Sequence, residues 1–132
     1  MNYIFYYKGV IQSHIYESLN SVLSNDESAN IFFCTDQNIN SKSERFNLIN
    51  LNEINSELID EIDKLENFEN LDNNPLWKTS LMRIFYIYEV ANKVKLDSFI
   101  HFDSDVLVYK PYKDLIKNFD QSKINITQLS KD

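Results

Sequence analysis

The sequence predicts an α/β domain with a mainly parallel sheet flanked by helices, and three observations support this. Short apolar runs typical of buried strands alternate with longer stretches in which apolar residues recur at helical spacing. Polar residues follow each strand-like run, where the carboxyl edge of a parallel sheet would lie. The chain has 132 residues with no internal repeat and no low-complexity linker, so we expect a single domain.

The expected elements follow from these runs and spacings. We predict strands at residues 2–7, 31–35, 45–49, 99–102, 106–109 and 124–127. We predict helices at residues 11–24, 54–68, 76–93 and 114–118, with a turn at 72–75. In the third helix Trp77, Leu81, Ile84, Phe85 and Tyr88 recur at helical spacing, and further apolar residues widen this surface. We therefore expect that helix to be largely buried.

Composition excludes several classes of function. The net charge is −7, which argues against sequence-independent binding of nucleic acid, because such binding needs basic patches. Gly9 is the only glycine, so a glycine-rich phosphate loop or dinucleotide fingerprint is absent. We expect Gly9 to break the first strand with a positive φ.

The sequence predicts a cytoplasmic protein without a membrane span. No apolar run reaches the roughly 20 residues that a spanning helix needs, and the N-terminus lacks the pattern of a signal peptide. The single cysteine, Cys34, excludes an internal disulfide and lies in an apolar run, where we expect an inert core thiol.

Asp103 and Asp105 interrupt an apolar and aromatic stretch, residues 99–109, and are the strongest candidates for a site. Two carboxylates about 4 Å apart repel by roughly 4 kcal/mol at an effective dielectric constant near 20. If both are buried, a divalent cation bound by their oxygens is the simplest compensation. The alternative is a turn between two strands, with both carboxylates in water.

A strand that runs into Asp-x-Asp, after a helix that bears an arginine, resembles the GT-A glycosyltransferases. The pattern is most similar to the glycogenin-like and lipopolysaccharide-type families that use nucleotide sugars. The matching segments are the N-terminal strand and the stretches CTD at 34–36, LMRIF at 81–85 and FDSDVLV at 102–108. The resemblance implies the Rossmann-like nucleotide-binding half of a GT-A fold, and therefore a chain truncated at its C-terminus.

The resemblance also implies roles for individual residues. Asp105 would bind Mn²⁺ or Mg²⁺, which would bridge the diphosphate of the donor. Asp103 would share the metal or bind hydroxyls of the ribose and the sugar. Arg83 would contact the phosphates or the donor sugar, where its planar guanidinium suits phosphate oxygens. Tyr7 and Asp36, which follow the first two strands, would contact the base.

Each of these residues has an alternative interpretation. Arg83 could pair with Glu89 or Asp97 on the surface. Tyr7 belongs to an aromatic strand and is favoured as a core residue. Asp36 could cap a helix or a turn.

His101 has the same strand parity as Asp103, so it is a second candidate ligand, although a hydrogen-bonded core histidine is the favoured interpretation. The histidine that supplies a further metal ligand in the family has no counterpart among the 132 residues.

Two other functions compete with sugar transfer. One is a nucleotide-sugar-binding remnant without turnover, since the acceptor-binding half of the family is not represented. The other is a phosphatase of the haloacid-dehalogenase type, which places Asp-x-Asp after a strand but near the chain start. The glycan, lipid or protein acceptor is left open. We expect an exposed sheet edge, and hence an oligomeric or marginally stable chain.

Overall fold

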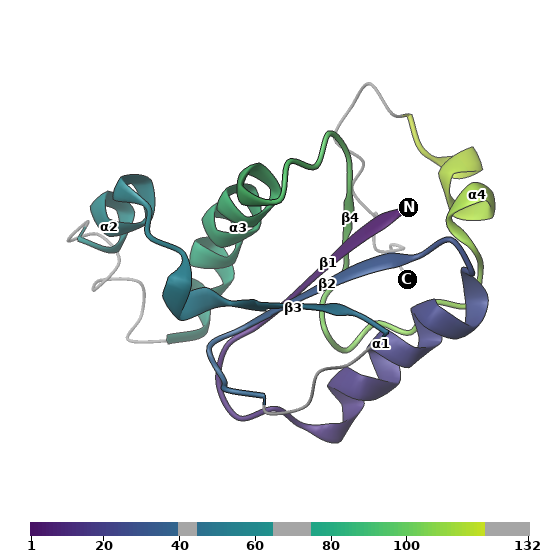
Figure 1. Cartoon of the computed structure of the whole chain (residues 1–132), viewed down its shortest axis with the longest axis horizontal. Helices are drawn as coiled ribbons and strands as arrows, with labels where there is room; N and C mark the ends of the chain where they lie inside the picture. Colours follow the sequence, from purple (N-terminus) through teal and green to yellow (C-terminus); the bar gives the residue numbers. More distant parts are fainter. Residues whose placement is uncertain (40–44, 65–74, 121–132) are drawn as a thin grey trace, which may run out of the picture.

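The computed structural model describes residues 1–39, 45–64 and 75–120 (Figure 1). Four strands form one sheet, and they are β1 (Asn2–Tyr7), β2 (Asn30–Thr35), β3 (Asn47–Asn50) and β4 (Ile100–His101). The helices are α1 (Ser13–Asn25), α2 (Glu57–Asp63), α3 (Pro75–Lys93) and α4 (Tyr112–Leu115), with 3-10 turns η1 (Leu51–Glu53) and η3 (Ile116–Asn118). All strand pairs are parallel, in the order β3-β2-β1-β4. The predicted α/β class is confirmed.

The core lies on both faces of β1 and β2, which pair over six residues. Alternate side chains of β1 point to opposite faces, as the strand period requires. Tyr3 and Phe5 pack with α1, whereas Ile4 and Tyr6 pack with α3. Helices therefore cover both faces, as expected for a parallel sheet (Figure 1). Cys34 is fully buried, and its burial raises the pKa of the thiol to about 12, as expected for an inert core residue.

The strand order reverses direction between β1 and β4. The chain runs from β1 through β2 to β3 on one side, and then returns to place β4 on the other side of β1. In open α/β sheets this reversal is a topological switch point, where a crevice forms outside the carboxyl ends of the strands. The residues that follow β1 and β4 lie at this point.

Residues 106–109 do not form the predicted strand, and this expectation was wrong. The backbone of this segment bonds to side chains of α1 instead of to a neighbouring strand. The Ser18 hydroxyl donates to the Val106 carbonyl, the Val108 N–H donates to Ser21 Oγ (2.9 Å), and Asn25 Nδ2 donates to the Val108 carbonyl (3.0 Å). Because helix side chains satisfy these backbone groups, the β-branched composition of the segment does not require a sheet.

The prediction that α3 is largely buried was also wrong. Its sheet-facing side contains the buried residues Met82, Ile87, Val90 and Ala91. Of the five stripe residues that we expected in the core, Phe85 is half-buried and the other four are exposed, with Trp77 at 60%, Leu81 at 37%, Ile84 at 59% and Tyr88 at 57%. Both stripes have helical spacing, so spacing alone could not tell which one faces the sheet.

The remaining predicted boundaries differ from the observed ones by a few residues. The acidic helix begins at Glu57, because Ser56 caps it by accepting a hydrogen bond from the Ile59 N–H. Residues 65–68 of that prediction, most of the turn at 72–75 and the strand at 124–127 lie outside the described residues. Among the described helices, none is long and apolar enough to cross a membrane.

Candidate functional site

The ends of β1 and β2 are joined through Asp36. β1 ends at Tyr7, and Gly9, two residues later, has the predicted positive φ (112°), a conformation that favours glycine. Asp36 Oδ1 accepts hydrogen bonds from the Gly9 N–H (2.9 Å) and from Gln37 Nε2 (3.1 Å). Partial burial raises the pKa of Asp36, but these bonds outweigh it and the net pKa lies below the ordinary value. Asp36 therefore stabilises a turn, as its alternative interpretation predicted.

Tyr7, the last residue of β1, is half-buried against the core cluster on the α1 side. Its ring centroid lies 6.5 Å from that of His14, in an edge-to-face arrangement. This position agrees with the core interpretation of Tyr7.

Asp103 and Asp105 lie in an exposed turn after β4. The Val106 N–H donates to the Asp103 carbonyl (3.1 Å), which closes the turn. The Asp103 side chain is 54% exposed and Asp105 is also exposed. Of the two interpretations of this pair, the one in which both carboxylates are buried was wrong, so no burial cost has to be compensated. Their geometry is that of the solvated turn.

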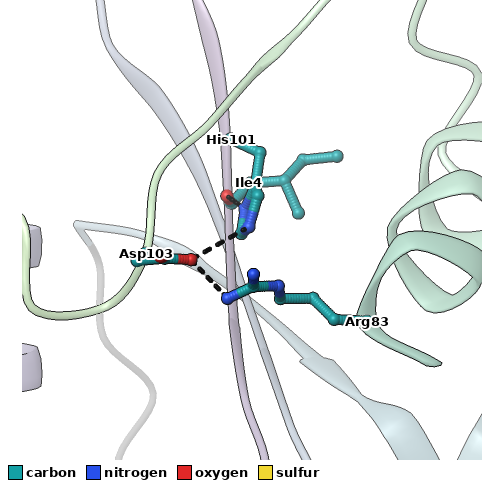
Figure 2. Close-up of polar contacts among 4 residues, drawn as sticks. All are labelled: Ile4, Arg83, His101 and Asp103. Atoms are coloured by element: carbon teal, nitrogen blue, oxygen red, sulfur yellow. Dashed lines mark hydrogen bonds and ion pairs between the residues drawn. The ribbon is translucent and has the colours of Figure 1, made fainter. Parts of the chain in front are cut away.

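Arg83 reaches this turn from α3 and forms an ion pair with Asp103 (Figure 2). It does not pair with Glu89, which accepts a hydrogen bond from the Ser56 hydroxyl (2.7 Å). Arg83 is on the side of α3 that faces the sheet, and its side chain is 30% exposed. The helix thus places the guanidinium at the carboxyl end of β4, where the resemblance implied a contact with the donor.

His101 lies between β1 and Asp103 (Figure 2). Its Nδ1 is 2.9 Å from the Ile4 carbonyl, and its Nε2 is 3.9 Å from Asp103 Oδ1. A carbonyl only accepts hydrogen bonds, so Nδ1 carries the proton and Nε2 has the lone pair of the neutral ring. Nε2 is buried and has no hydrogen-bond partner among the described residues. Burial, more than any other influence, lowers the pKa of His101, so the neutral form is favoured.

A cavity of about 220 Å³ lies at the end of β1. Its lining residues come from β1, the residue after it, α2 and α3, and are Tyr6, Lys8, Ile59, Asp60, Asp63, Lys78, Thr79, Met82 and Tyr86. The Tyr6 hydroxyl is buried and has no hydrogen-bond partner within the described part of the chain. Lys8 Nζ lies 6.0 Å from the ring centroid of Tyr86. Sequence reasoning missed this cavity, because its residues share no motif or spacing.

The structure brings together Arg83, His101 and Asp103. Asp105 lies in the same turn as Asp103 but takes no part in these contacts, whereas Tyr7 and Asp36 contact other residues. Asp105 forms no hydrogen bond or ion pair with any described residue. Within residues 1–39, 45–64 and 75–120, no three His, Cys, Asp or Glu side chains are grouped closely enough to bind a metal by themselves. A metal at this turn would have to complete its coordination with water or with oxygens of a ligand, as Mg²⁺ commonly does.

Comparisons with protein-family models, with curated proteins and with solved structures gave no match to this sequence. The identification of a family therefore depends on the residues themselves.

Proposed function

We propose that this domain binds a nucleotide-diphosphate sugar in a metal-dependent manner and serves sugar transfer, in the way of a GT-A glycosyltransferase. The main support is the position of the Asp-Ser-Asp turn at the switch point of a parallel sheet, with Arg83 beside it. This is where α/β domains bind nucleotides, and it brings carboxylates and a guanidinium to one place. We propose that the protein acts in the cytoplasm.

The side chains at this turn suit a diphosphate. Arg83 is always charged, and its planar array of donors matches phosphate oxygens. Asp103 and Asp105 provide the oxygen ligands that Mn²⁺ or Mg²⁺ prefers, and the exposure of both leaves room for a ligand to approach. When bound, such an ion supplies positive charge that stabilises the departing diphosphate.

Asp105 offers the cleanest test, because it has no side-chain hydrogen bond or ion pair to lose among the described residues. We expect Asp105→Asn to abolish the Mn²⁺-dependent part of the binding of uridine- and guanosine-diphosphate sugars, measured by calorimetry. Asp97→Asn is the matched control, because Asp97 is also exposed and the substitution makes the same chemical change away from the turn. Equal binding by the two variants would remove the metal role from Asp105.

Release of nucleoside diphosphate separates a transferase from a binding remnant. The wild-type protein is incubated with Mn²⁺, the bound donor and a panel of glycan, lipid and peptide acceptors. Release that depends on acceptor and on Asp105 supports transfer, whereas tight donor binding without release supports the remnant.

A further inference from the structure

We propose that His101 and Asp103 bind one divalent transition-metal ion between them, and that Arg83 moves from Asp103 to the phosphates of the donor when the ion binds. The metal-binding half of this inference is independent of the donor. The second half rests on the proposed function.

The first argument is the fixed orientation of the His101 ring. Metal-binding histidines commonly donate their other ring nitrogen to a backbone carbonyl or a carboxylate, which fixes the tautomer. His101 makes this contact through Nδ1 and the Ile4 carbonyl, at 2.9 Å. The lone pair of Nε2 consequently points away from β1 toward Asp103 (Figure 2).

The second argument is that Nε2 lacks a partner in the described structure. Buried polar atoms are nearly always hydrogen-bonded, and the exceptions need an explanation such as an ion or a water. Nε2 is buried without a hydrogen bond, and the nearest carboxylate oxygen, Asp103 Oδ1, is 3.9 Å away. An ion between the two would satisfy the nitrogen.

The distance between the two atoms fits a shared ion. Metal–nitrogen and metal–oxygen bonds of about 2.1 Å place two ligands of one ion roughly 3 to 4 Å apart. The separation of 3.9 Å lies within this range. Asp103 is half exposed, so its carboxylate can rotate to improve the geometry without a change in the sheet.

An imidazole nitrogen changes which ion is preferred. Carboxylate and water ligands suit Mg²⁺, whereas imidazole favours transition metals such as Co²⁺ and Zn²⁺, and affinities rise from Mn²⁺ toward these ions. A site that contains His101 should therefore select transition metals over Mg²⁺, which a pair of aspartates alone would not do.

Arg83 competes with the ion for one atom. Its guanidinium contacts Asp103 Oδ1, the same oxygen that lies nearest to His101 Nε2. Arg83 cannot lose its charge, so a divalent ion at this oxygen repels it. A diphosphate bound to the ion offers Arg83 a new anionic partner within the same site. The exchange therefore links metal binding to donor binding.

The first test uses metal ions alone, without donor. We expect wild-type protein to bind Co²⁺ and Mn²⁺ more tightly than Mg²⁺ in calorimetry. His101→Asn retains an amide that can donate to the Ile4 carbonyl but lacks Nε2, and should bind Co²⁺ and Mn²⁺ roughly tenfold or more weakly. His14→Asn alters the only other histidine and should leave these affinities unchanged.

A measurement on the wild-type protein keeps this test valid if the variant misfolds. Trace Mn²⁺ should broaden the imidazole proton signals of His101 in NMR spectra, and those of His14 should stay sharp. Unchanged affinity in a folded His101→Asn variant, or equal broadening of both histidines, would overturn the assignment of His101 as a ligand.

The second test uses Arg83→Gln, for which the two halves of the proposal predict opposite signs. Without donor, Mn²⁺ affinity should rise several-fold because the competing cation is gone. With Mn²⁺ saturating, affinity for the nucleotide sugar should fall. Lys113→Gln removes the same charge from the exposed side of α4 and should change neither value. Unchanged or weaker Mn²⁺ binding by Arg83→Gln would overturn the exchange.

The outcomes separate this inference from the proposed function. If metal-dependent donor binding requires Asp105 but not His101, the proposed function stands and the role of His101 is wrong. If His101 governs Co²⁺ affinity while no nucleotide sugar binds, the metal site stands and the proposed function is wrong.

Discussion

Two aspartates at opposite ends of the same sheet show how differently this fold treats a carboxylate. Asp26 follows α1 near the amino end of the sheet and is 4% exposed. It accepts hydrogen bonds from the Tyr3 hydroxyl (2.7 Å), from Ser28 N–H and Oγ (3.0 and 2.6 Å) and from the Tyr112 N–H (3.1 Å). Asp103, at the carboxyl end, is half exposed and has one cationic partner, Arg83.

The difference separates stability from binding. Asp26 connects β1, the turn before β2 and the start of α4, and its hydrogen-bonding capacity is largely used. A hydrogen-bond network that fully satisfies a buried carboxylate specifies one arrangement. Asp103 retains accessible oxygens beside a nitrogen without a partner, so it can exchange partners when a ligand arrives.

The largest expected effect is the loss of the Asp26 carboxylate. Asp26→Ala leaves the buried Tyr3 hydroxyl and the part-buried donors of Ser28 and Tyr112 without their acceptor, which should lower the free energy of unfolding by about 3 kcal/mol. Asp103→Ala removes an exposed pair and should cost about 1 kcal/mol or less. Urea denaturation of both variants measures the two values, and similar costs would contradict the contrast between the two ends.

A second prediction concerns pH. Burial raises the pKa of Asp26, but hydrogen bonds from Ser28 and Tyr3 outweigh it, so the pKa falls from 3.8 to about 2. The folded state therefore binds the proton less tightly than the unfolded state. The resulting stabilisation is present above about pH 4 and is lost as the pH falls toward 2.

The expected loss is roughly 2 kcal/mol, because a tenfold difference in proton affinity corresponds to about 1.4 kcal/mol. Other carboxylates titrate in the same range, so the informative quantity is the difference in free energy of unfolding between wild type and Asp26→Asn. This difference should shrink between pH 5 and pH 2. A constant difference would show that Asp26 does not titrate as its hydrogen bonds predict.

Tyr3→Phe removes one donor from the same network and should have an intermediate effect. A hydrogen bond to a charged acceptor contributes about 1.5 kcal/mol or slightly more, so the variant should lose about that amount of stability. The pKa of Asp26, measured by NMR titration, should rise toward its ordinary value. Tyr109→Phe is the control, because it removes the same hydroxyl from a residue that is 75% exposed and lies outside the network.

Sequence patterns predicted the sheet and the principal candidate residues for physical reasons. Buried parallel strands such as β1 and β2 require continuous apolar runs, and these are visible without a structure. The shared strand parity of His101 and Asp103 likewise placed both on one side of β4, where they lie close together.

The features that the sequence did not predict correctly depend on tertiary contacts. The segment after Asp105 looked like a strand, but its backbone groups bond to α1 side chains that lie more than 80 residues earlier in the chain. The Ile4 carbonyl, which orients His101, is a backbone group that no side-chain pattern reveals. The two apolar stripes of α3 are distinguished only by which one reaches the sheet.

The smallest expected effect on stability is that of Arg83→Lys. This variant tests whether the Asp103 end of the sheet serves binding and not stability. Lysine keeps the charge that faces Asp103 but lacks the planar donors that match phosphate oxygens. The ion pair with Asp103 is partly exposed, so the melting temperature should change by about 2 °C or less. Affinity for the nucleotide sugar should fall, as measured by calorimetry with Mn²⁺. A large drop in melting temperature with intact donor affinity would make Arg83 a structural residue. The carboxyl end of the sheet would then resemble the Asp26 end, and the proposed division between stability and binding would be wrong.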